Sequence, residues 1–499
     1  MINLLPLFPV ISLAGAFLIP LIGRNKKGVS DAITFICTLA LFGLSIVSLF
    51  ISKEKSLLVY SIGGWKPPLG ICFVLDGLSA FMLVTLNIVS FLIAIYSISY
   101  MEKYTDKYKF YSLFMLMVAG MNGVILTGDI FNLFVFLEIA SVASYALVAY
   151  GTEEEELEAA FKYAVMGTIA SSFILLGIGL LYAYTSTLNM ADLSGVIVAK
   201  GGGLLLPFVT VLFIAGFGIK SALVPFHAWL PDAHPSAPAS ISAMLSGVLI
   251  KILGIYSLSR ILFNVFGVNK FTLLVLMVLG AISLLIGVFL AIGQWDFKRL
   301  LAYHSISQVG YIVLAIGLGT PLGILAGLFH LFNHSVFKSL LFLNSGAVEY
   351  ATGTRDLKAM GGLRQRMPIT ATTSWIASMA ISGVPPFNGF WSKLIIIIAC
   401  VQSGRIGFAI VAVVGSILTL ASFMKVQKYA FFGGLNKKFE NIKEVPFCMQ
   451  LSMYLFAIIC IFAAVLLIPR ISAYFINPAQ EALLSGHRYA VMVLGGGKL

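Results

Sequence analysis

Five charged residues lie in the middle of apolar stretches long enough to cross a lipid bilayer: Glu138, Lys220, Lys251, Lys338 and Lys393. Glu138 is the only acidic residue in such a place, because the other acids fall in loops or at the ends of apolar segments. A charge at the mid-depth of a membrane is costly unless it finds a partner, water or another protonation state. Ion carriers need such residues, so these five predict ion translocation.

Glu138 and Lys220 are predicted to form a buried ion pair in which each residue controls the protonation of the other. A protonated Glu138 that hydrogen-bonds to a neighbouring helix is the structural alternative. Lys220 lies near the carbonyl end of a half-helix, where a positive charge is favoured, whereas Lys393 lies near the start of one, where the dipole and desolvation disfavour the ammonium. We therefore expect Lys220 to hold its proton and Lys393 to release one readily.

Two histidines and a lysine recur at four-residue spacing, His330, His334 and Lys338, and are predicted to line one face of a helix. Histidine titrates near neutral pH, so this row predicts a hydrogen-bonded proton relay with water. A metal site is less favoured, because no carboxylate or cysteine on the same segment completes a ligand set. Lys251 lies too deep to reach the membrane surface easily, and His304 is either part of the relay or a helix cap.

The segment from Trp229 to Pro238 is rich in proline and is predicted to be a rigid turn. Asp232 and His234 lie within this segment, and His227 lies just before it. These three polar residues make the mouth of a channel the alternative interpretation. Other charges are assigned to solvated positions: the acidic loop 153–156, the pair Glu158 and Lys162, and the basic anchors 298–299 and 355–366.

The elements that position these residues are predicted from hydropathy. The 499 residues are 60% hydrophobic and 10% charged, with a mean hydropathy of +1.01, whereas soluble domains have about 25% charged residues. We therefore expect an all-α polytopic membrane protein with a single domain over 1–499. About 20 apolar residues span a bilayer, which predicts fourteen spans, near 3–23, 29–51, 73–98, 110–127, 130–149, 161–184, 205–227, 238–260, 271–293, 303–319, 321–348, 369–400, 406–430 and 450–470.

Two of these segments are interrupted by proline, at Pro225 and at Pro385-Pro386. Proline removes a helix hydrogen bond and clashes with the preceding turn, so both helices are expected to break at mid-depth. Paired interrupted helices favour a transporter built from inverted repeats, with its site at the repeat interface. Kinks that serve only packing are the alternative.

The distribution of basic residues predicts the orientation. Loops after odd-numbered spans carry 18 lysines and arginines and the opposite loops carry 10, which places both termini outside the cell membrane. The first positive charges follow the first apolar run, so that run is not expected to be a cleavable signal. The 18 residues are Arg24, Lys26, Lys27, Lys103, Lys107, Lys109, Lys162, Lys298, Arg299, Arg355, Lys358, Arg364, Arg366, Lys425, Lys428, Lys437, Lys438 and Lys443.

Composition also argues against several function classes. The net charge of +12 is dispersed over short loops, which favours anionic lipid headgroups over nucleic acid as the partner. The five cysteines are scattered without a Cys-x-x-Cys spacing, so no iron–sulfur cluster, structural zinc or disulfide framework is indicated. We expect no cofactor and no metal in this chain, and any electron transfer to take place in another subunit.

Three stretches resemble a known family: 129–138, 218–235 and 382–393. They are similar to the antiporter-like subunits, which include the M-type and N-type proton-channel subunits of respiratory NADH:quinone oxidoreductase, the D-type subunit of Mrp cation/proton antiporters and the equivalent subunit of membrane-bound hydrogenase-like complexes. The resemblance covers nearly the whole chain. It implies fourteen helices in two inverted five-helix repeats, 110–260 and 271–430, flanked by 1–98 and 450–499.

The resemblance also implies roles along a polar axis. Glu138 matches the family's glutamate, Lys220 its paired lysine, Lys251 its central lysine and Lys393 the lysine of the broken twelfth helix. The polar residues of helix eleven match His330, His334 and Lys338. Some members have glutamate in place of the last lysine. The chain ends 29 residues after the last predicted span, so it resembles the D, M or N type without a lateral helix.

These observations together predict a proton-translocating subunit that is not an enzyme by itself. Protons are expected to be taken up near Lys220 and Lys251, to pass the helix-eleven row and to leave from Lys393, with Glu138 as a gate. The expected partners are other membrane subunits, lipid and protons. The rivals are a structural subunit, a Na⁺-coupled subunit, a quinone-binding enzyme subunit and a stand-alone solute carrier. The excess of lysine favours protons over sodium, which prefers oxygen ligands.

Overall fold

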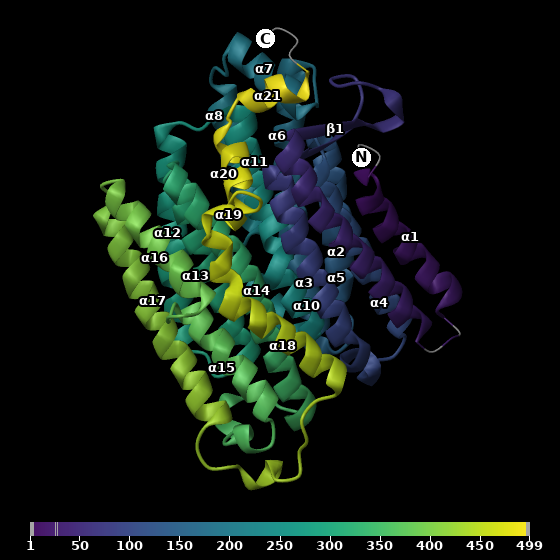
Figure 1. Ribbon diagram of the computed structural model, residues 1–499, viewed down its shortest axis with the longest axis vertical. Coiled ribbons are helices and arrows are strands. Elements are labelled where there is room, and N and C mark those ends of the chain that lie inside the picture. Colours follow the sequence, from purple (N-terminus) through teal and green to yellow (C-terminus); the bar gives the residue numbers. More distant parts are fainter. Residues whose placement is uncertain (1–3, 25, 27, 496–499) are drawn as a thin grey trace.

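A computed structural model describes residues 4–24, 26 and 28–495. Residue 3, where the first predicted span begins, and Lys27 of the predicted basic loops lie outside the described residues. Helices dominate the described chain (Figure 1). The α-helices are α1 (Leu7–Ile22), α2 (Val29–Lys55), α3 (Gly77–Tyr100), α4 (Lys107–Leu126), α5 (Ile130–Val148), α6 (Glu154–Thr185), α7 (Met190–Lys200), α8 (Leu205–Lys220), α9 (Leu230–Ser236), α10 (Ala239–Met244), α11 (Ser257–Arg260), α12 (Lys270–Ile292), α13 (Phe297–Gly317), α14 (Pro321–Thr352), α15 (Pro368–Ser382), α16 (Asn388–Gln402), α17 (Ile406–Val426), α18 (Phe447–Phe462), α19 (Pro469–Ser472), α20 (Ile476–Leu484) and α21 (Arg488–Val493).

Shorter helical turns of other types continue several of these helices. The π-helical segments are η4 (Leu245–Leu249), η5 (Lys251–Tyr256), η6 (Ile261–Phe266) and η9 (Gln427–Phe431). The 3₁₀ turns are η2 (Ile62–Gly64), η3 (Met101–Lys103), η7 (Leu357–Ala359), η8 (Leu363–Gln365), η10 (Lys437–Phe439) and η11 (Ala463–Leu467). Together α10, η4, η5, α11 and η6 form one apolar span over Ala239–Phe266.

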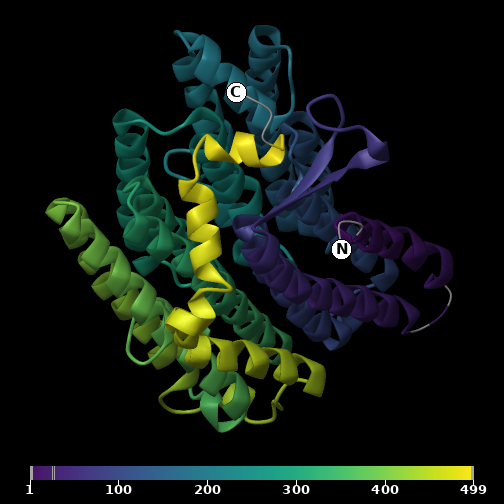
Figure 2. The same ribbon diagram turned by 45° about the horizontal axis from the view of Figure 1, so that its top comes forward.

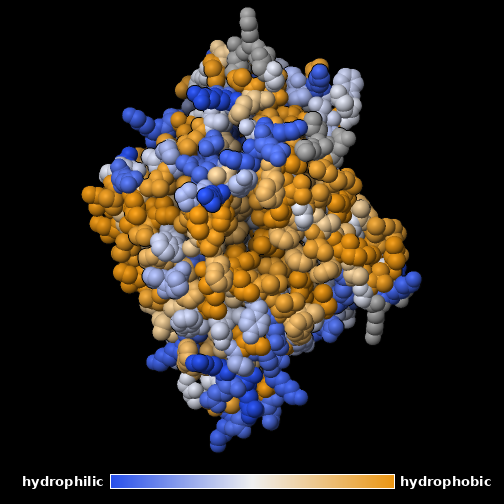
Figure 3. Space-filling model, in the orientation of Figure 1, coloured by the Kyte–Doolittle hydropathy of each residue, from blue (hydrophilic) through white to orange (hydrophobic). Residues whose placement is uncertain are grey.

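The prediction of a helical multi-span membrane protein is confirmed. Within the described chain, eleven helices are long and apolar enough to cross a membrane, and α1, α8 and α16 are shorter apolar helices. Each of the fourteen predicted ranges overlaps one of these. On the face in Figure 3, apolar residues form a broad band across the middle, and hydrophilic residues gather at both ends. The number of fourteen crossings and the division into two repeats stay predictions.

Helix starts differ from the predicted ranges where a polar first turn precedes the apolar run. The sixth span was predicted from 161, but α6 begins at Glu154, where Glu153 and Glu156 form a capping box. The tenth was predicted from 303, but α13 begins at Phe297, because Asp296 accepts a hydrogen bond from the backbone of Arg299. A hydropathy window leaves out such charged turns.

A two-stranded antiparallel sheet was not predicted. The strands are β1 (Leu57–Ser61) and β2 (Cys72–Asp76), with Leu57 opposite Asp76. Residues 73–76 had been assigned to the third span, because a short apolar run reads the same in a buried strand as in a helix. Asp76 ends β2 and caps α3 by accepting a hydrogen bond from the backbone of Ser79.

Both predicted helix breaks are confirmed. α8 ends at Lys220 before α9 begins at Leu230, and α15 ends at Ser382 before α16 begins at Asn388. In Figure 1, α8 lies toward the upper end of the molecule and α15 toward the lower end. The prediction of a turn after Trp229 is wrong, because residues 230–236 form α9: Pro231 lies in its first turn, where proline suits a helix.

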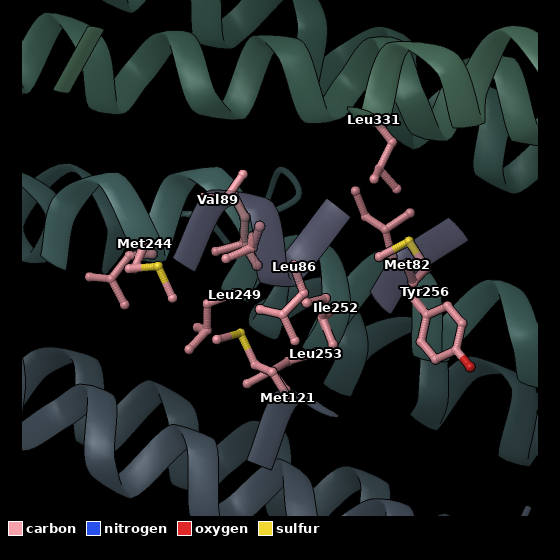
Figure 4. Close-up of a cluster of buried hydrophobic side chains, with 14 of the residues drawn as sticks. Met82, Leu86, Val89, Met121, Met244, Leu249, Ile252, Leu253, Tyr256 and Leu331 are labelled. Carbon is pink, nitrogen blue, oxygen red and sulfur yellow. The ribbon is translucent and has the colours of Figure 1, made fainter. Parts of the chain in front are cut away.

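The C-terminal segment ties the flanking helices to the rest of the bundle. α18 and α20 both pack against α3 and α14, and Figure 2 shows them crossing between the N-terminal helices and α16 and α17. Below this layer, α3, α4, α14 and the π-wound span enclose an apolar cluster that includes Leu86, Met121, Leu249, Leu253 and Leu331 (Figure 4). Leu249 and Leu253 lie two residues before and two residues after Lys251 in sequence, so apolar side chains pack on both sides of the backbone at Lys251.

Candidate functional site

Glu138 of α5 and Lys220 of α8 lie side by side, as predicted. The distance from Lys220 Nζ to Glu138 Oε1 is 3.5 Å; the lysine side chain is 4% exposed and the glutamate 31%. The ammonium also lies 3.0 Å from Ser141 Oγ and 3.4 Å from Tyr145 OH, and Ser171 donates a hydrogen bond to Glu138. The pair is therefore closed on the lysine side and accessible on the glutamate side.

Lys220 is the last residue of α8, so its charge lies at the carbonyl end of a half-helix. This is the position that the sequence predicted, and it favours an ammonium. The break that follows is held by Trp229, whose Nε1 donates to the carbonyl of Ile219 at 2.9 Å. The fold thus fixes α9 against the end of α8.

Lys251 is fully buried and finds backbone acceptors instead of a carboxylate. Its Nζ donates to the carbonyls of Ser246 and Gly247, the latter at 2.7 Å. Both carbonyls belong to the preceding turn of the same span, which is wound as a π-helix around this position. Single π-helical turns inside α-helices are frequent at functional sites.

His330, His334 and Lys338 lie on one buried face of α14, as predicted, and are hereafter the α14 row. His330 Nδ1 lies 2.9 Å from Ser392 Oγ on α16, and Lys338 donates to the carbonyl of Leu301 on α13. His334 lies between them, and the described residues offer its two ring nitrogens no hydrogen-bond partner. The row therefore connects α13 to α16 along one side of α14.

Lys393 lies near the start of α16, as the sequence predicted, but the surroundings of its ammonium differ from the prediction. Its Nζ reaches back across the break and donates to the carbonyl of Ile381 at 2.7 Å, at the carbonyl end of α15. The expectation that a helix dipole disfavours this ammonium is wrong, because the flexible lysine stem spans the gap. Gly383 leaves room for it: a Cβ there would come within 3.0 Å of Lys393 Cδ.

Several polar residues near this row were missed or left open by the sequence reasoning. His234 was assigned to a turn, yet it is fully buried on α9 with both ring nitrogens unpartnered among the described residues. His304 does not cap a helix, because α13 starts at Phe297; its Nε2 lies 2.8 Å from Ser422 Oγ. Gln308, also fully buried on α13, was not considered. A polar residue inside an apolar span is the sequence signal that could have identified Gln308 as part of the candidate site.

Buried polar atoms without partners concentrate around this row. A buried polar group that lacks a hydrogen bond costs about 1–3 kcal/mol, and ordered water is the usual partner for such groups. Water is therefore the expected hydrogen-bond partner of these groups. The affected side chains in the described part of the chain include His234, His304, Ser307, Gln308, His330, His334 and Asn344.

Two further ion pairs lie outside the predicted site. Arg260 is buried and binds Asp76 through both terminal nitrogens, at 2.6 and 2.8 Å. It is the last residue of a predicted span, where a basic residue looks like part of a loop, but the helix continues to Phe266. Lys298, predicted as a surface anchor, is also buried, and its Nζ lies 2.8 Å from Glu349 Oε2.

A charged cavity of about 490 Å³ opens beside α9, at the face that carries the loop after α14. Asp232 pairs there with Lys162 at 3.1 Å and with Arg299 at 3.4 Å. Partial burial lowers the pKa of the Arg355 guanidinium, but the nearby carboxylates, above all Asp296, have the larger opposite effect. The pKa of Arg355 is therefore raised. The alternative interpretation of this segment, a channel mouth, therefore has a cavity to match.

The described residues contain no group of three or more His, Cys, Asp or Glu side chains arranged to hold a metal ion. Within the same described ranges, Lys251, Lys338 and Lys393 have no carboxylate within 4.0 Å, unlike Lys220. The candidate site is thus one ion pair, three lysines held by backbone carbonyls, and two histidines, of which His330 contacts a hydroxyl and His334 has no hydrogen-bond partner among the described residues.

Comparison with known proteins identifies relatives of the same architecture. A family profile described as "NADH:quinone oxidoreductase/Mrp antiporter, TM" matches residues 127–419, and one described as "NADH-Ubiquinone oxidoreductase (complex I), chain 5 N-terminus" matches 60–111. The D subunit of the Na(+)/H(+) antiporter of Alkalihalophilus pseudofirmus is 37% identical, over 79% of this chain and 80% of its own. The N subunit of the NADH-quinone oxidoreductase of Desulforudis audaxviator is 39% identical, over 75% and 76%.

Solved structures agree with the sequence relatives. A chain of the Mrp complex from Dietzia superposes with a TM-score of 0.91 at 29% identity, covering 99% of both chains. A chain of an archaeal membrane-bound sulfane sulfur reductase superposes with a TM-score of 0.88 at 31% identity, covering 98% of this chain and 99% of its own. The fold is therefore shared over essentially the full length.

Proposed function

This chain belongs to the NADH:quinone oxidoreductase/Mrp antiporter family of membrane subunits, and from that premise we propose that it translocates protons within a multisubunit membrane complex. Its relatives are named as the D subunit of a Na(+)/H(+) antiporter and the N subunit of an NADH-quinone oxidoreductase. The proposed partners are accordingly other membrane subunits. Redox cofactors of such a complex would be held by those subunits, and the proposed location is the cell membrane with both termini outside.

The observation that carries the proposal is the buried row itself. Glu138 pairs with Lys220 at the end of α8, and α8 packs against η5, which begins at Lys251. α14 packs against η4, which precedes Lys251, and against α16, which carries Lys393. Unpartnered ring nitrogens of His330 and His334 lie along it. Histidine and lysine side chains exchange protons with water, and charged side chains inside a membrane mark ion pathways.

Glu138 is the proposed gate. While it pairs with Lys220 it stabilises the ammonium, and when the two separate the lysine loses its counter-ion and yields its proton to the row. Moving one charge against 100 mV costs about 2.3 kcal/mol. Leaving a buried charge without its partner costs about 3–5 kcal/mol, which is more than the cost of this step. The rest of the complex must supply the energy that separates the pair.

Protons are the proposed cargo of this row in preference to sodium. Sodium is coordinated by oxygen ligands, and carboxylates are the strongest of these in proteins. Glu138 is the only described carboxylate within 4.0 Å of the four intramembrane lysines. The carbonyls that approach Lys251, Lys338 and Lys393 are already engaged by an ammonium.

The test uses the assembled complex in sealed vesicles. We expect Glu138→Gln, which keeps the size of the side chain, to leave assembly intact and to reduce proton translocation by about tenfold or more, as for loss of a positioned acid–base group. Lys220→Ala should give the same result. Proton uptake is followed with a pH-sensitive dye, and assembly by co-purification of the other subunits.

Glu54→Gln is the matched control, because Glu54 lies exposed in the last turn of α2. It should translocate protons like the unaltered protein. If the chain is only a structural subunit, the result differs in one of two ways. Either the Glu138→Gln and Lys220→Ala variants fail to assemble, or they assemble and the complex translocates protons normally.

A further inference from the structure

Four hydroxyl side chains line one face of α15 at four-residue spacing: Thr370, Ser374, Ser378 and Ser382. All four are at most 3% exposed. Residues four apart on a helix lie one above the other, so these hydroxyls form a column, hereafter the α15 column. The column begins at the start of α15, where Thr370 donates a hydrogen bond to Glu444, and it ends at the break after Ser382. α15 lies toward the lower end of the molecule in Figure 1.

Hydroxyls inside membrane helices usually bond to the carbonyl four residues earlier, and Ser382 does so toward Ser378. The middle of the column is different. Gln427, at the start of η9, donates from Nε2 to both Ser378 Oγ at 2.9 Å and Ser374 Oγ at 3.2 Å. A side chain from another helix thus joins two rungs, which helix formation alone does not require.

Gln427 is also incompletely satisfied. It is 1% exposed, and its Oε1 has no hydrogen-bond partner among the described residues. The residue lines a cavity of about 280 Å³ together with Arg364, Thr372 and Trp375. Such an acceptor beside a cavity of this size is a place for water. The column therefore has a polar opening at the face of the basic loops.

The inner end of the column reaches Lys393. Ser416 Oγ donates to the carbonyl of Ser382 at 2.8 Å and lies 3.5 Å from Lys393 Nζ, which itself donates to the carbonyl of Ile381. Gly383, with a φ of +79°, allows the lysine and Ser416 to approach here, because a Cβ would lie 3.2 Å from Ser416 Oγ and 3.0 Å from Lys393 Cδ.

We propose that the α15 column and Gln427 form an additional proton access path, which connects Lys393 to the face of the basic loops without passing through the α14 row. Water in the 280 Å³ cavity supplies the proton. Successive hydroxyls of the column share no hydrogen bond among the described residues, so water between them carries the proton from one hydroxyl to the next. Each hydroxyl accepts one proton from water and gives its own to the next water, so the column gains no net charge, and the neutral amine of Lys393 accepts the last one. This proposal rests on the proposed function, because it presupposes that Lys393 exchanges protons.

The test compares three variants in the assembled complex. Gln427→Leu keeps the approximate volume of the side chain but removes both polar atoms, and we expect proton translocation to fall by about tenfold. Ser378→Ala removes one rung with little change in packing and should lower it in the same direction. Gln427→Glu, which keeps the volume and an acceptor at Oε1, should retain most of the rate. If Gln427 served packing alone, Gln427→Leu would retain the rate as well.

Ser90→Ala is the matched control, because Ser90 is equally buried on α3 and, among the described residues, bonds only to the carbonyl of Leu86 in its own helix. The proposal is overturned if Ser378→Ala translocates protons at the rate of Ser90→Ala, whether or not Gln427→Leu assembles. Glu138→Gln, measured in parallel, separates the two proposals. If it stops translocation while Ser378→Ala does not, only the α15 path fails; if it has no effect, the proposed function fails.

Discussion

A lysine at the mid-depth of a membrane needs acceptors for its ammonium, and the four in this chain obtain them in two ways. Lys220 has a carboxylate at 3.5 Å, whereas Lys251, Lys338 and Lys393 donate to backbone carbonyls. A carbonyl carries only a partial charge and cannot gain or lose a proton. The difference between Lys220 and Lys393 therefore lies in the counter-ion, since both ammonium groups sit at carbonyl ends of half-helices.

The buried pair of Asp76 and Arg260 gives a prediction about stability. Asp76→Asn leaves the guanidinium buried without its counter-ion, and we expect this to destabilise the protein by about 3–5 kcal/mol. Thermal unfolding of the purified complex in detergent measures the effect. Lys109→Ala is the comparison, because Lys109 and Asp106 form an exposed pair and such pairs contribute about 0–1 kcal/mol. Equal effects of the two substitutions would contradict the assigned role of the buried pair.

At the scale of elements, the crossing of α15 and α16 depends on close backbone contact. A Cβ at Gly389 would lie 1.8 Å from the carbonyl oxygen of Ala380. Because this oxygen belongs to the backbone of α15, the clash could be relieved only by moving one of the two half-helices. The two half-helices can therefore pass each other only with glycine at this position. The same crossing sets where Lys393 projects from α16.

Gly389→Ala is accordingly expected to prevent assembly or to lower the unfolding temperature strongly. Gly383→Ala, at a φ of +79°, should assemble, but the complex should translocate protons poorly because the new methyl group displaces Lys393. Gly407→Ala on α17 is the control, since its Cβ would meet nothing within 4 Å. Co-purification and vesicle assays report the two outcomes. Normal assembly of Gly389→Ala would show that the half-helices are held less closely than the structure indicates.

At the scale of the whole molecule, the loop between α17 and α18, which carries Lys437, Lys438 and Lys443, lies at one end, and the β1–β2 hairpin lies toward the other (Figure 1). If the basic face is cytoplasmic, as proposed, Lys66→Cys in the hairpin should react with a membrane-impermeant maleimide in intact cells. Lys437→Cys in the basic loops should react only after permeabilisation. Both positions are exposed. The background should lack Cys37 and Cys448, which are partly accessible. The reverse labelling pattern would invert the proposed direction of transport.

The sequence by itself determined the membrane class and the helix breaks, and it supplied most residues of the candidate site, because burying a charge in lipid is so costly that each such residue is conspicuous. It could also pair Glu138 with Lys220, since no other acid was available at that depth. It could not identify Arg260, Lys298 or His234 as buried, because polar residues near segment ends look like loop residues until the helix boundaries and neighbours are known.

Only the tertiary structure decided what each buried charge contacts. Lys393 was placed correctly on its helix but given the wrong electrostatic surroundings, because a flexible side chain that crosses a break is invisible to helical periodicity. The column on α15 likewise needed Gln427, which approaches from a helix 49 residues away from Ser378. Hydropathy and spacing act along one chain segment, whereas hydrogen bonds between helices depend on how the segments are packed together.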